Sequence, residues 1–226
     1  MGQFIDLTAP DGHQFSNYLA VPAGPPRGGI VVGMEMYGVN RYLKSVCDDF
    51  AISGYAALAP ALFDRFAPAI THEYDDAGSA AGKDLSARTD HSLTMMDVST
   101  SADYLRNLNS GLKVAILGFC FGGTVTWLAA CRASFDAAVA YYGSDMCDYP
   151  EEIPNCPVLC HVGDQDTAVP PEDVNSFRTM RPEPEWCIYE GAPHGFDNAT
   201  RPARYHQSAA KLARERTLSF LSEHLG

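Results

Sequence analysis

The sequence has few positive charges and no long apolar run. Lys and Arg number 16 against 28 Asp and Glu, so the formal net charge is −12 at pH 7. Because nucleic acids and anionic membrane surfaces are bound through clustered Lys and Arg, this balance predicts neither as a partner. The first residues lack a basic stretch followed by an apolar one, and no apolar run approaches the roughly 20 residues that span a bilayer. We therefore expect a cytoplasmic protein.

Cysteine is present, but without the pattern of a disulfide framework. There are seven cysteines, an odd number, which favours reduced thiols. The tightest group, Cys156, Cys160 and His161, lies in an apolar run whose alternation sends neighbours to opposite faces. We expect no metal site there, and no cofactor.

Short apolar runs rich in β-forming residues alternate with helical patterns. The runs lie at 29–33, 55–59, 112–117, 137–142, 157–162 and 186–189, and the helical patterns at 42–52, 93–108, 125–132, 172–180 and about 202–224. Several runs are nearly continuous, which is typical of a parallel sheet covered on both faces by helices. This alternation predicts an α/β fold with a mostly parallel, doubly wound sheet in one domain over residues 1–226. Residues 14–21 could add an antiparallel strand at its edge.

Residues 63–91 have a different character. Charged residues, proline and glycine are scattered through them with little periodicity. We expect an irregular excursion over the edge of the sheet. Such a long loop is either a lid or substrate wall, or simply a solvated connection.

A cysteine lies at the centre of a glycine-rich turn that directly follows one apolar run. Residues 118–123 read Gly-Phe-Cys-Phe-Gly-Gly. A strained strand-to-helix turn needs glycine on both sides of the nucleophile, because a Cβ there would collide with the neighbouring strand or helix. The following helix would direct its N-terminal amides at the Cys120 sulfur and favour a thiolate. Alternatively, Cys120 is a small buried residue in a glycine-rich crossover.

Two further segments place polar groups just beyond apolar runs. Asp166 follows the run 157–162 and is the candidate acid, since a carboxylate there can accept the Nδ1 proton of a histidine. Asp164 and Asp166 could instead be ordinary turn residues. His194 stands in a Gly- and Pro-rich loop after the next run and is the candidate base, although a loop histidine alone is more often a surface residue. The order nucleophile, acid, base favours the catalytic interpretation.

These motifs resemble the dienelactone hydrolase (carboxymethylenebutenolidase) family of the α/β-hydrolase fold. The resemblance rests on 118–123, 163–170 and 191–196, and on the pattern Glu-x-x-Gly-x-Asn at 35–40. It implies an α/β-hydrolase fold, with the site at the carboxyl ends of the strands. It also implies that Glu35 takes the proton of the nucleophile, a role that suits a carboxylate whose pKa burial raises. Glu35 as an edge salt-bridge partner is the alternative.

The same resemblance suggests the remaining site residues. The oxyanion would be held by the backbone N–H groups of Met36 and Phe121. Family members hold a substrate carboxylate with two arginines, one before the nucleophile and one shortly after the histidine. The candidate substrate-binding residues are Tyr141, Phe196, Arg88 and Arg201, with Arg65 as an alternative to Arg88 and core packing as an equal explanation for Tyr141.

We therefore expect a hydrolase that opens small activated lactones or esters through an acyl-thioester on Cys120. A thiolate is also a good leaving group, so the enzyme would suit substrates whose ring-opened product is a stabilised enolate. Two alternatives stay open. One is a broad carboxylesterase or thioesterase, and the other is a non-catalytic binding protein with Cys120 as a redox-sensitive thiol. We expect a monomer or a small homo-oligomer.

Overall fold

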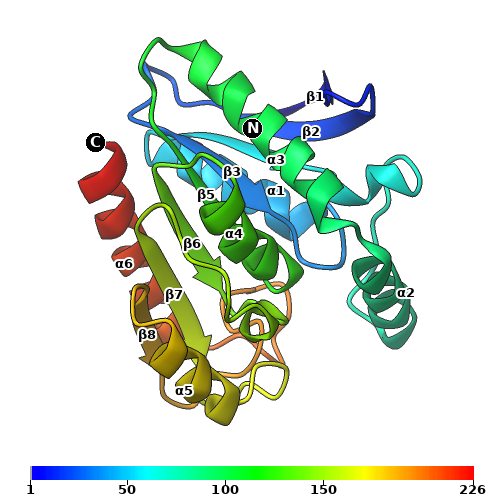
Figure 1. Cartoon of the computed structure of the whole chain (residues 1–226). Coiled ribbons are helices and arrows are strands. Elements are labelled where there is room, and N and C mark those ends of the chain that lie inside the picture. Colours follow the sequence, from blue (N-terminus) through cyan, green and yellow to red (C-terminus); the bar gives the residue numbers. More distant parts are fainter. Residues whose placement is uncertain (1) are drawn as a thin grey trace.

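The structure is a computed structural model that describes residues 2–226 (Figure 1). Within these residues, eight strands form a sheet in the order β1-β2-β4-β3-β5-β6-β7-β8. The strands are β1 Gln3–Thr8, β2 Gln14–Ala20, β3 Gly29–Gly33, β4 Ala56–Pro60, β5 Val114–Phe119, β6 Ala137–Tyr141, β7 Val158–Gly163 and β8 Glu185–Tyr189. From β4 to β8 in this order every neighbouring pair is parallel, whereas β2 is antiparallel to β1 and β4. The predicted mostly parallel sheet is confirmed.

The edge of the sheet differs from the prediction. The antiparallel strand expected at 14–21 forms as β2, but β1 pairs outside it, with Phe4 opposite Tyr18. The side chains of β1 alternate between exposed and half-buried, so this strand lacks the continuous apolar run that predicted β3 to β7. The assignment of 14–21 to the edge is therefore wrong.

Helices cover both faces of the sheet, as predicted. They are α1 Arg41–Ile52, α2 Asp76–Arg88, α3 His91–Leu108, α4 Phe121–Arg132, α5 Pro171–Met180 and α6 Gln207–Leu225, with short 3-10 turns η1 Leu62–Arg65 and η2 Met146–Asp148. Helices α3, α4 and α5 lie on one face, and α1 and α6 on the other (Figure 1). No helix in the described part of the chain has the length and hydropathy needed to cross a bilayer.

The expectation of an irregular segment at 63–91 is wrong, because α2 occupies thirteen of these residues. Asp75 caps this helix by accepting the amide of Gly78 at 2.7 Å. Only Gly78, Gly82 and Leu85 of this helix are buried, so the helix has no apolar stripe that a sequence pattern could reveal. The helix instead approaches by its backbone: a Cβ on Gly82 would lie 2.3 Å from the carbonyl oxygen of Met36. Helix α2 thus forms a wall against the loop that follows β3.

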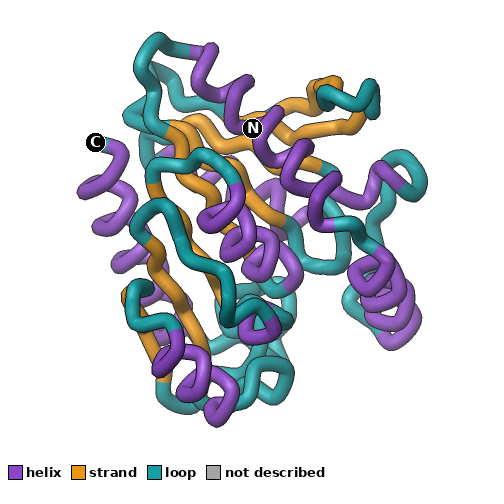
Figure 2. Tube along the Cα trace, in the orientation of Figure 1, coloured by secondary structure: helices purple, strands orange, loops and turns teal. Residues whose placement is uncertain are grey.

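Strand β5 and helix α4 lie at the centre of the molecule. All six residues of β5 are buried, and α4 is buried from Phe121 to Ala130. A helix that is apolar all round belongs in the interior, and for this reason its sequence shows no amphipathic stripe. The loops that follow the parallel strands gather along one edge of the sheet, at the lower side of Figure 2. The turn between β5 and α4 opens onto this edge.

Candidate active site

Cys120 occupies the turn between β5 and α4, with φ 55° and ψ −116°. A residue other than glycine in such a conformation carries strain of order 1–3 kcal/mol and persists only where its surroundings fix it. A Cβ on Gly118 would lie 2.1 Å from the carbonyl oxygen of Gly122, and a Cβ on Gly122 would lie 2.4 Å from that of Gly33 in β3. The close packing of α4 on β3 and β5 therefore requires both flanking glycines, as predicted. It holds Cys120 at the carboxyl edge of the sheet.

The amides expected to hold an oxyanion belong to neighbouring strand ends. Phe121 is the first residue of α4, and Met36 lies in the loop after β3. Strand β3 pairs with β5, with Gly33 opposite Gly118. Across residues 2–226, neither amide donates a hydrogen bond to another protein group. The N-terminus of α4 adds a positive potential to these donors. An anion forming on a group attached to Cys120 would thus meet unpaired donors and a helix dipole.

Asp166 and His194 come together from the loops after β7 and β8. His194 Nδ1 lies 2.8 Å from Asp166 Oδ2. Both residues are buried, with 7% and 2% exposure. The second oxygen, Asp166 Oδ1, accepts the amides of Ala168 at 2.8 Å and Val169 at 2.9 Å. These bonds fix the carboxylate, so it accepts the Nδ1 proton and leaves Nε2 as the ring nitrogen free of Asp166.

The charge on His194 is set by its neighbours. Burial alone would lower the pKa of His194, but the nearby Cys120 sulfur and the Asp166 carboxylate outweigh burial and raise this pKa to about 10. Tyr142 packs edge-on against the imidazole with 5.0 Å between the ring centroids. The structure therefore brings Cys120, Asp166 and His194 to one place, and Tyr142 supports the ring.

Glu35 is buried at the carboxyl end of β3, with 3% exposure. Its Oε2 accepts the hydroxyl of Tyr74 at 2.7 Å and the amide Nδ2 of Asn198 at 3.2 Å. Burial raises the pKa of Glu35, while Tyr74, Arg201 and His194 act in the opposite direction. The direction agrees with the prediction from the sequence.

Two aromatic candidates lie in the core. The Tyr141 hydroxyl is 2.7 Å from Thr217 Oγ1 on α6, and its ring is 4.4 Å from that of His161. Phe196 is fully buried and packs on Tyr189 at 5.1 Å. The core explanation for Tyr141 therefore fits its contacts, and the next residue, Tyr142, is the aromatic that touches His194.

Of the two candidate arginines, one lies near Glu35 and the other lies on the surface. Arg201 lies over the rings of Tyr74 and Tyr37, at 4.7 and 5.3 Å, and its charge acts on Glu35. Arg88 is on the surface of α2, where it pairs with Asp84 at 2.8 Å and stands over Phe66 at 5.0 Å. The structure thus brings Arg201 to the site and leaves Arg88 outside it.

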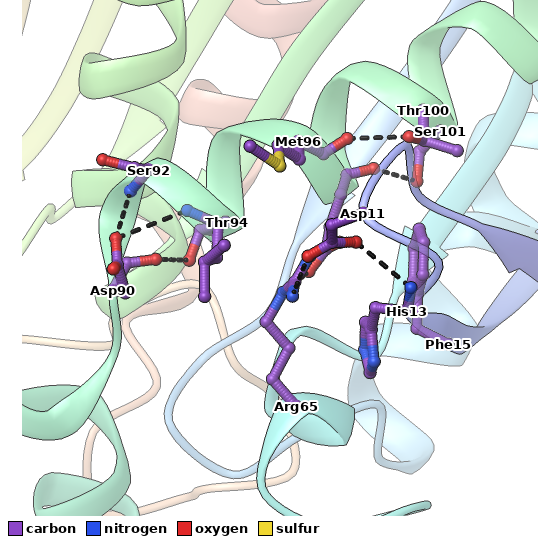
Figure 3. Close-up of polar contacts among 12 residues, drawn as sticks. Asp11, His13, Phe15, Arg65, Asp90, Ser92, Thr94, Met96, Thr100 and Ser101 are labelled. Atoms are coloured by element: carbon purple, nitrogen blue, oxygen red, sulfur yellow. Dashed lines mark hydrogen bonds and ion pairs between the residues drawn. The ribbon is translucent and has the colours of Figure 1, made fainter.

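Arg65 is committed to a structural ion pair. Its guanidinium binds Asp97 at 2.7 Å and Asp11 at 2.8 Å, and the Asp97 side chain is only 1% exposed. Figure 3 shows Arg65 reaching Asp11 beneath α3, the helix that Asp90 caps by accepting the amide of Ser92. Because the Arg65 guanidinium already donates to two carboxylates, it is not available to bind the carboxylate of a substrate.

Sequence reasoning missed Tyr74 and Asn198. Tyr74 stands just before the α2 cap in the segment taken as irregular, and Asn198 follows His194 by four positions. Their bonds to Glu35 span 39 and 163 residues of sequence. The only signal in the sequence was the cluster of polar residues after His194.

A cavity of about 460 Å³ lies apart from this site, between α1 and α6. Its lining includes Tyr42, Asp49, Phe119, Asp197 and Arg214, but neither Cys120 nor His194. Within this lining, the Tyr42 hydroxyl donates to Asp197 Oδ2 at 2.8 Å. Among residues 2–226, no group of three or more His, Cys, Asp or Glu side chains is arranged to hold a metal ion.

Comparison with known proteins identifies the family of this chain. A sequence model of the dienelactone hydrolase family matches residues 15–225. The chain belongs to the dienelactone hydrolase family. A carboxymethylenebutenolidase from Pseudomonas putida is 32% identical over 225 residues, covering 96% of this chain and 95% of the relative. The same identity and coverage are found for the carboxymethylenebutenolidase of Pseudomonas knackmussii.

Solved structures extend the similarity within and beyond the dienelactone hydrolase family. The crystal structure of a proposed dienelactone hydrolase from Klebsiella pneumoniae superposes with a TM-score of 0.86, at 27% identity and 99% coverage of both chains. An alpha-beta serine hydrolase homologue from Coxiella burnetii gives a TM-score of 0.65 at 16% identity, covering 93% of this chain and 96% of that one. The latter similarity concerns the fold alone. The fold is the α/β-hydrolase fold, as predicted.

Proposed function

We propose that this dienelactone hydrolase family member opens small activated lactones and esters by attack of the Cys120 sulfur. The observation that carries the proposal is the His194–Asp166 hydrogen bond of 2.8 Å, formed beside a cysteine with φ 55° in a glycine-flanked turn. A nucleophile, a base and a group that orients the base are the elements of covalent acyl transfer. The name carboxymethylenebutenolidase, given to relatives at 32% identity, supports a lactone as the substrate class.

The first step forms a thioester. Glu35 or His194 takes the thiol proton, and the sulfur attacks the carbonyl carbon. The carbonyl oxygen gathers negative charge between the amides of Phe121 and Met36, donors that lack a protein partner in the described chain. The ring C–O bond then breaks, and the alcohol oxygen leaves with its electron pair and takes up the proton that Glu35 or His194 had accepted. An enolate leaves more readily than an alkoxide, so the mechanism favours activated lactones.

The second step hydrolyses the thioester. His194, held through Nδ1 by Asp166, takes a proton from water through Nε2. The resulting hydroxide attacks the acyl carbon, the C–S bond breaks, and the sulfur departs with the electron pair. His194 then returns its proton to the sulfur. The carboxylic acid and the free thiol are the products, so each turnover adds one water across the ester bond.

Substitution of Cys120 and His194 tests this function. Cys120→Ala and His194→Ala should each abolish hydrolysis of a lactone or a p-nitrophenyl ester, while circular dichroism shows an unchanged fold. Cys131→Ala, a half-buried cysteine on α4, is the matched control and should keep full activity. Full activity in Cys120→Ala would contradict the proposal.

The same assay separates the alternatives. A preference for plain alkyl esters over lactones would identify a broad carboxylesterase. If no ester or lactone turned over and Cys120 titrated as an ordinary thiol, a non-catalytic binding protein would be favoured.

A further inference from the structure

Glu35 is held by a group of side chains that can only donate to it. Tyr74 reaches Glu35 Oε2 at 2.7 Å, and Asn198 Nδ2 reaches the same oxygen at 3.2 Å. Tyr74 itself receives Asn40 Nδ2 at 2.9 Å and Asn198 Nδ2 at 2.8 Å. Two donors thus meet at one carboxylate oxygen, and Asn40 is joined to it through Tyr74.

The orientation of both asparagine amides is fixed independently of Tyr74. Asn40 Oδ1 accepts the amide of Leu43 at 3.1 Å, because Asn40 caps α1. Asn198 Oδ1 accepts the amide of Thr200 at 3.0 Å and its hydroxyl at 2.6 Å. Since each oxygen is bound to a backbone N–H, each NH₂ group must face Tyr74.

The position of the Tyr74 proton follows from these contacts. A phenol oxygen has one proton to donate and two lone pairs to accept with. Both lone pairs of Tyr74 receive amide protons, so its own proton points to Glu35 Oε2. Burial and the Glu35 carboxylate raise the pKa of Tyr74, which keeps the hydroxyl protonated. Glu35 Oε2 therefore faces two donors and has no room for a proton of its own.

We propose that Tyr74, locked by Asn40 and Asn198, is the positioning residue that commits Glu35 Oε2 to accepting hydrogen bonds and leaves Oε1 as the oxygen that takes the Cys120 proton. Within residues 2–226, Oε1 has no hydrogen-bond partner. In the transfer the S–H bond breaks, an O–H bond forms at Oε1, and the electron pair stays on sulfur. The inference rests on the proposed function, because it names the acceptor of the first proton.

Other charged and titratable groups also face Glu35. Arg201 and His194 favour the carboxylate, whereas the buried carboxyl of Asp197 acts against it. The remaining groups near enough to interact are the hydroxyls of Tyr42 and Tyr142. None of these five makes a hydrogen bond to Glu35 in the described chain, so Tyr74 and Asn198 are the contacts that distinguish its two oxygens.

The chain offers a matched pair of variants for the test. Tyr37 packs on Tyr74 with 4.4 Å between the rings, and both lie beneath Arg201. The Tyr37 hydroxyl, however, pairs with Ser79 at 2.9 Å and not with Glu35. Tyr74→Phe and Tyr37→Phe therefore remove one hydroxyl each from the same cluster, and only the first removes a donor to Glu35.

The pKa of Glu35 can be measured directly by NMR of protein labelled with ¹³C at the glutamate carboxyl carbons. Its resonance is assigned as the one missing in Glu35→Gln. We expect Tyr74→Phe to raise the pKa of Glu35 by about 1 to 2, as the loss of a hydrogen bond to a charged group implies, and Tyr37→Phe to leave it unchanged. The acid limb of the kcat/KM profile should move upward by the same amount in Tyr74→Phe.

An equal pKa of Glu35 in the two variants would overturn the inference. If Tyr74→Phe fails to fold, Asn198→Ala removes the second donor and should raise the pKa in the same direction. The titration does not depend on turnover. A protein that hydrolyses no ester would refute the proposed function and still report the pKa of Glu35, so the two failures are distinguishable.

Discussion

His194 and Asp166 form a buried hydrogen bond of 2.8 Å, in which the carboxylate is anchored on its far side by the amides of Ala168 and Val169. The anchoring matters because the oxygen that faces the imidazole cannot turn away. The histidine is thereby kept in one tautomer, with Nε2 available to water. The pair lies at the loops after β7 and β8, next to the turn that carries Cys120.

Asp166→Asn should lower kcat/KM by about 10² to 10⁴-fold, because an amide NH₂ facing Nδ1 favours the wrong tautomer. The fold should persist, since the amide oxygen can still accept the two backbone N–H groups. Asp164→Asn is the matched control, because Asp164 accepts only the amide of Gly191 at 2.7 Å in this turn. Steady-state kinetics of both variants check this. Equal activity in the two would remove Asp166 from the mechanism.

Gly118→Ala should destabilise the protein by about 3 kcal/mol or more, since the new Cβ would lie 2.1 Å from the backbone oxygen of Gly122 and neither strand nor helix can yield. Gly24→Ala, where a Cβ meets nothing within 4 Å, should be neutral. Urea unfolding gives both free energies. Equal free energies of unfolding would mean that α4 can pack on β5 without glycine at position 118.

Arg201→Gln should raise KM for a lactone that bears a carboxylate by about 10 to 100-fold, the cost of a charge-assisted hydrogen bond. It should change KM much less for the neutral amide analogue of that lactone. Arg88→Gln should leave both values unchanged, because Arg88 pairs with Asp84 on the surface. If Arg88 rather than Arg201 controlled KM, α2 would have to move toward the site when substrate binds.

His161 should make the protein sensitive to acid. It is fully buried between Tyr189 and Thr217, at 2.8 and 2.9 Å, and burial lowers the pKa of His161 to about 3. Its neutral form is favoured by folding, so stability is present above pH 6.5 and is lost as the pH falls toward 3. The loss is at most about 5 kcal/mol, at 1.36 kcal/mol for each pH unit.

His161→Gln tests this prediction. The variant should be less stable than the wild type at pH 7, because the glutamine amide replaces the ring bonds imperfectly. Its free energy of unfolding should then fall less steeply between pH 6.5 and 3, measured by urea titrations at several pH values. Parallel curves for the two proteins would assign the acid sensitivity to other groups.

The sequence allowed the sheet to be predicted where strands are buried on both faces. Strands β3 to β7 read as apolar runs because helices cover them, whereas β1 is half-exposed and has no such run. Helix α2 escaped notice for a related reason: it packs on the loop after β3 through Gly82, which lies against Met36, rather than through an apolar stripe. A helix that approaches by its backbone leaves little trace in a hydrophobic pattern.

In the candidate site, local motifs were more informative than long-range contacts. The turn around Cys120 and the order of Asp166 and His194 follow from glycine requirements and strand ends. The support of Glu35 by Tyr74 depends on residues 39 positions apart, and the choice between Tyr141 and Tyr142 depends on the turn after β6, where Tyr142 has φ 39° and its ring packs against His194. Neither can be read from local sequence patterns, because both are set by packing between loops.

The acyl-enzyme itself tests the central claim most directly. His194→Gln, incubated with a p-nitrophenyl ester, quenched in acid and digested, should carry the acyl group on the peptide that contains Cys120, because loss of the base slows hydrolysis of the thioester more than its formation. The remaining six cysteines should be unmodified at short times. An acyl group on another residue, or release of p-nitrophenol at the wild-type rate by Cys120→Ala, would contradict the account.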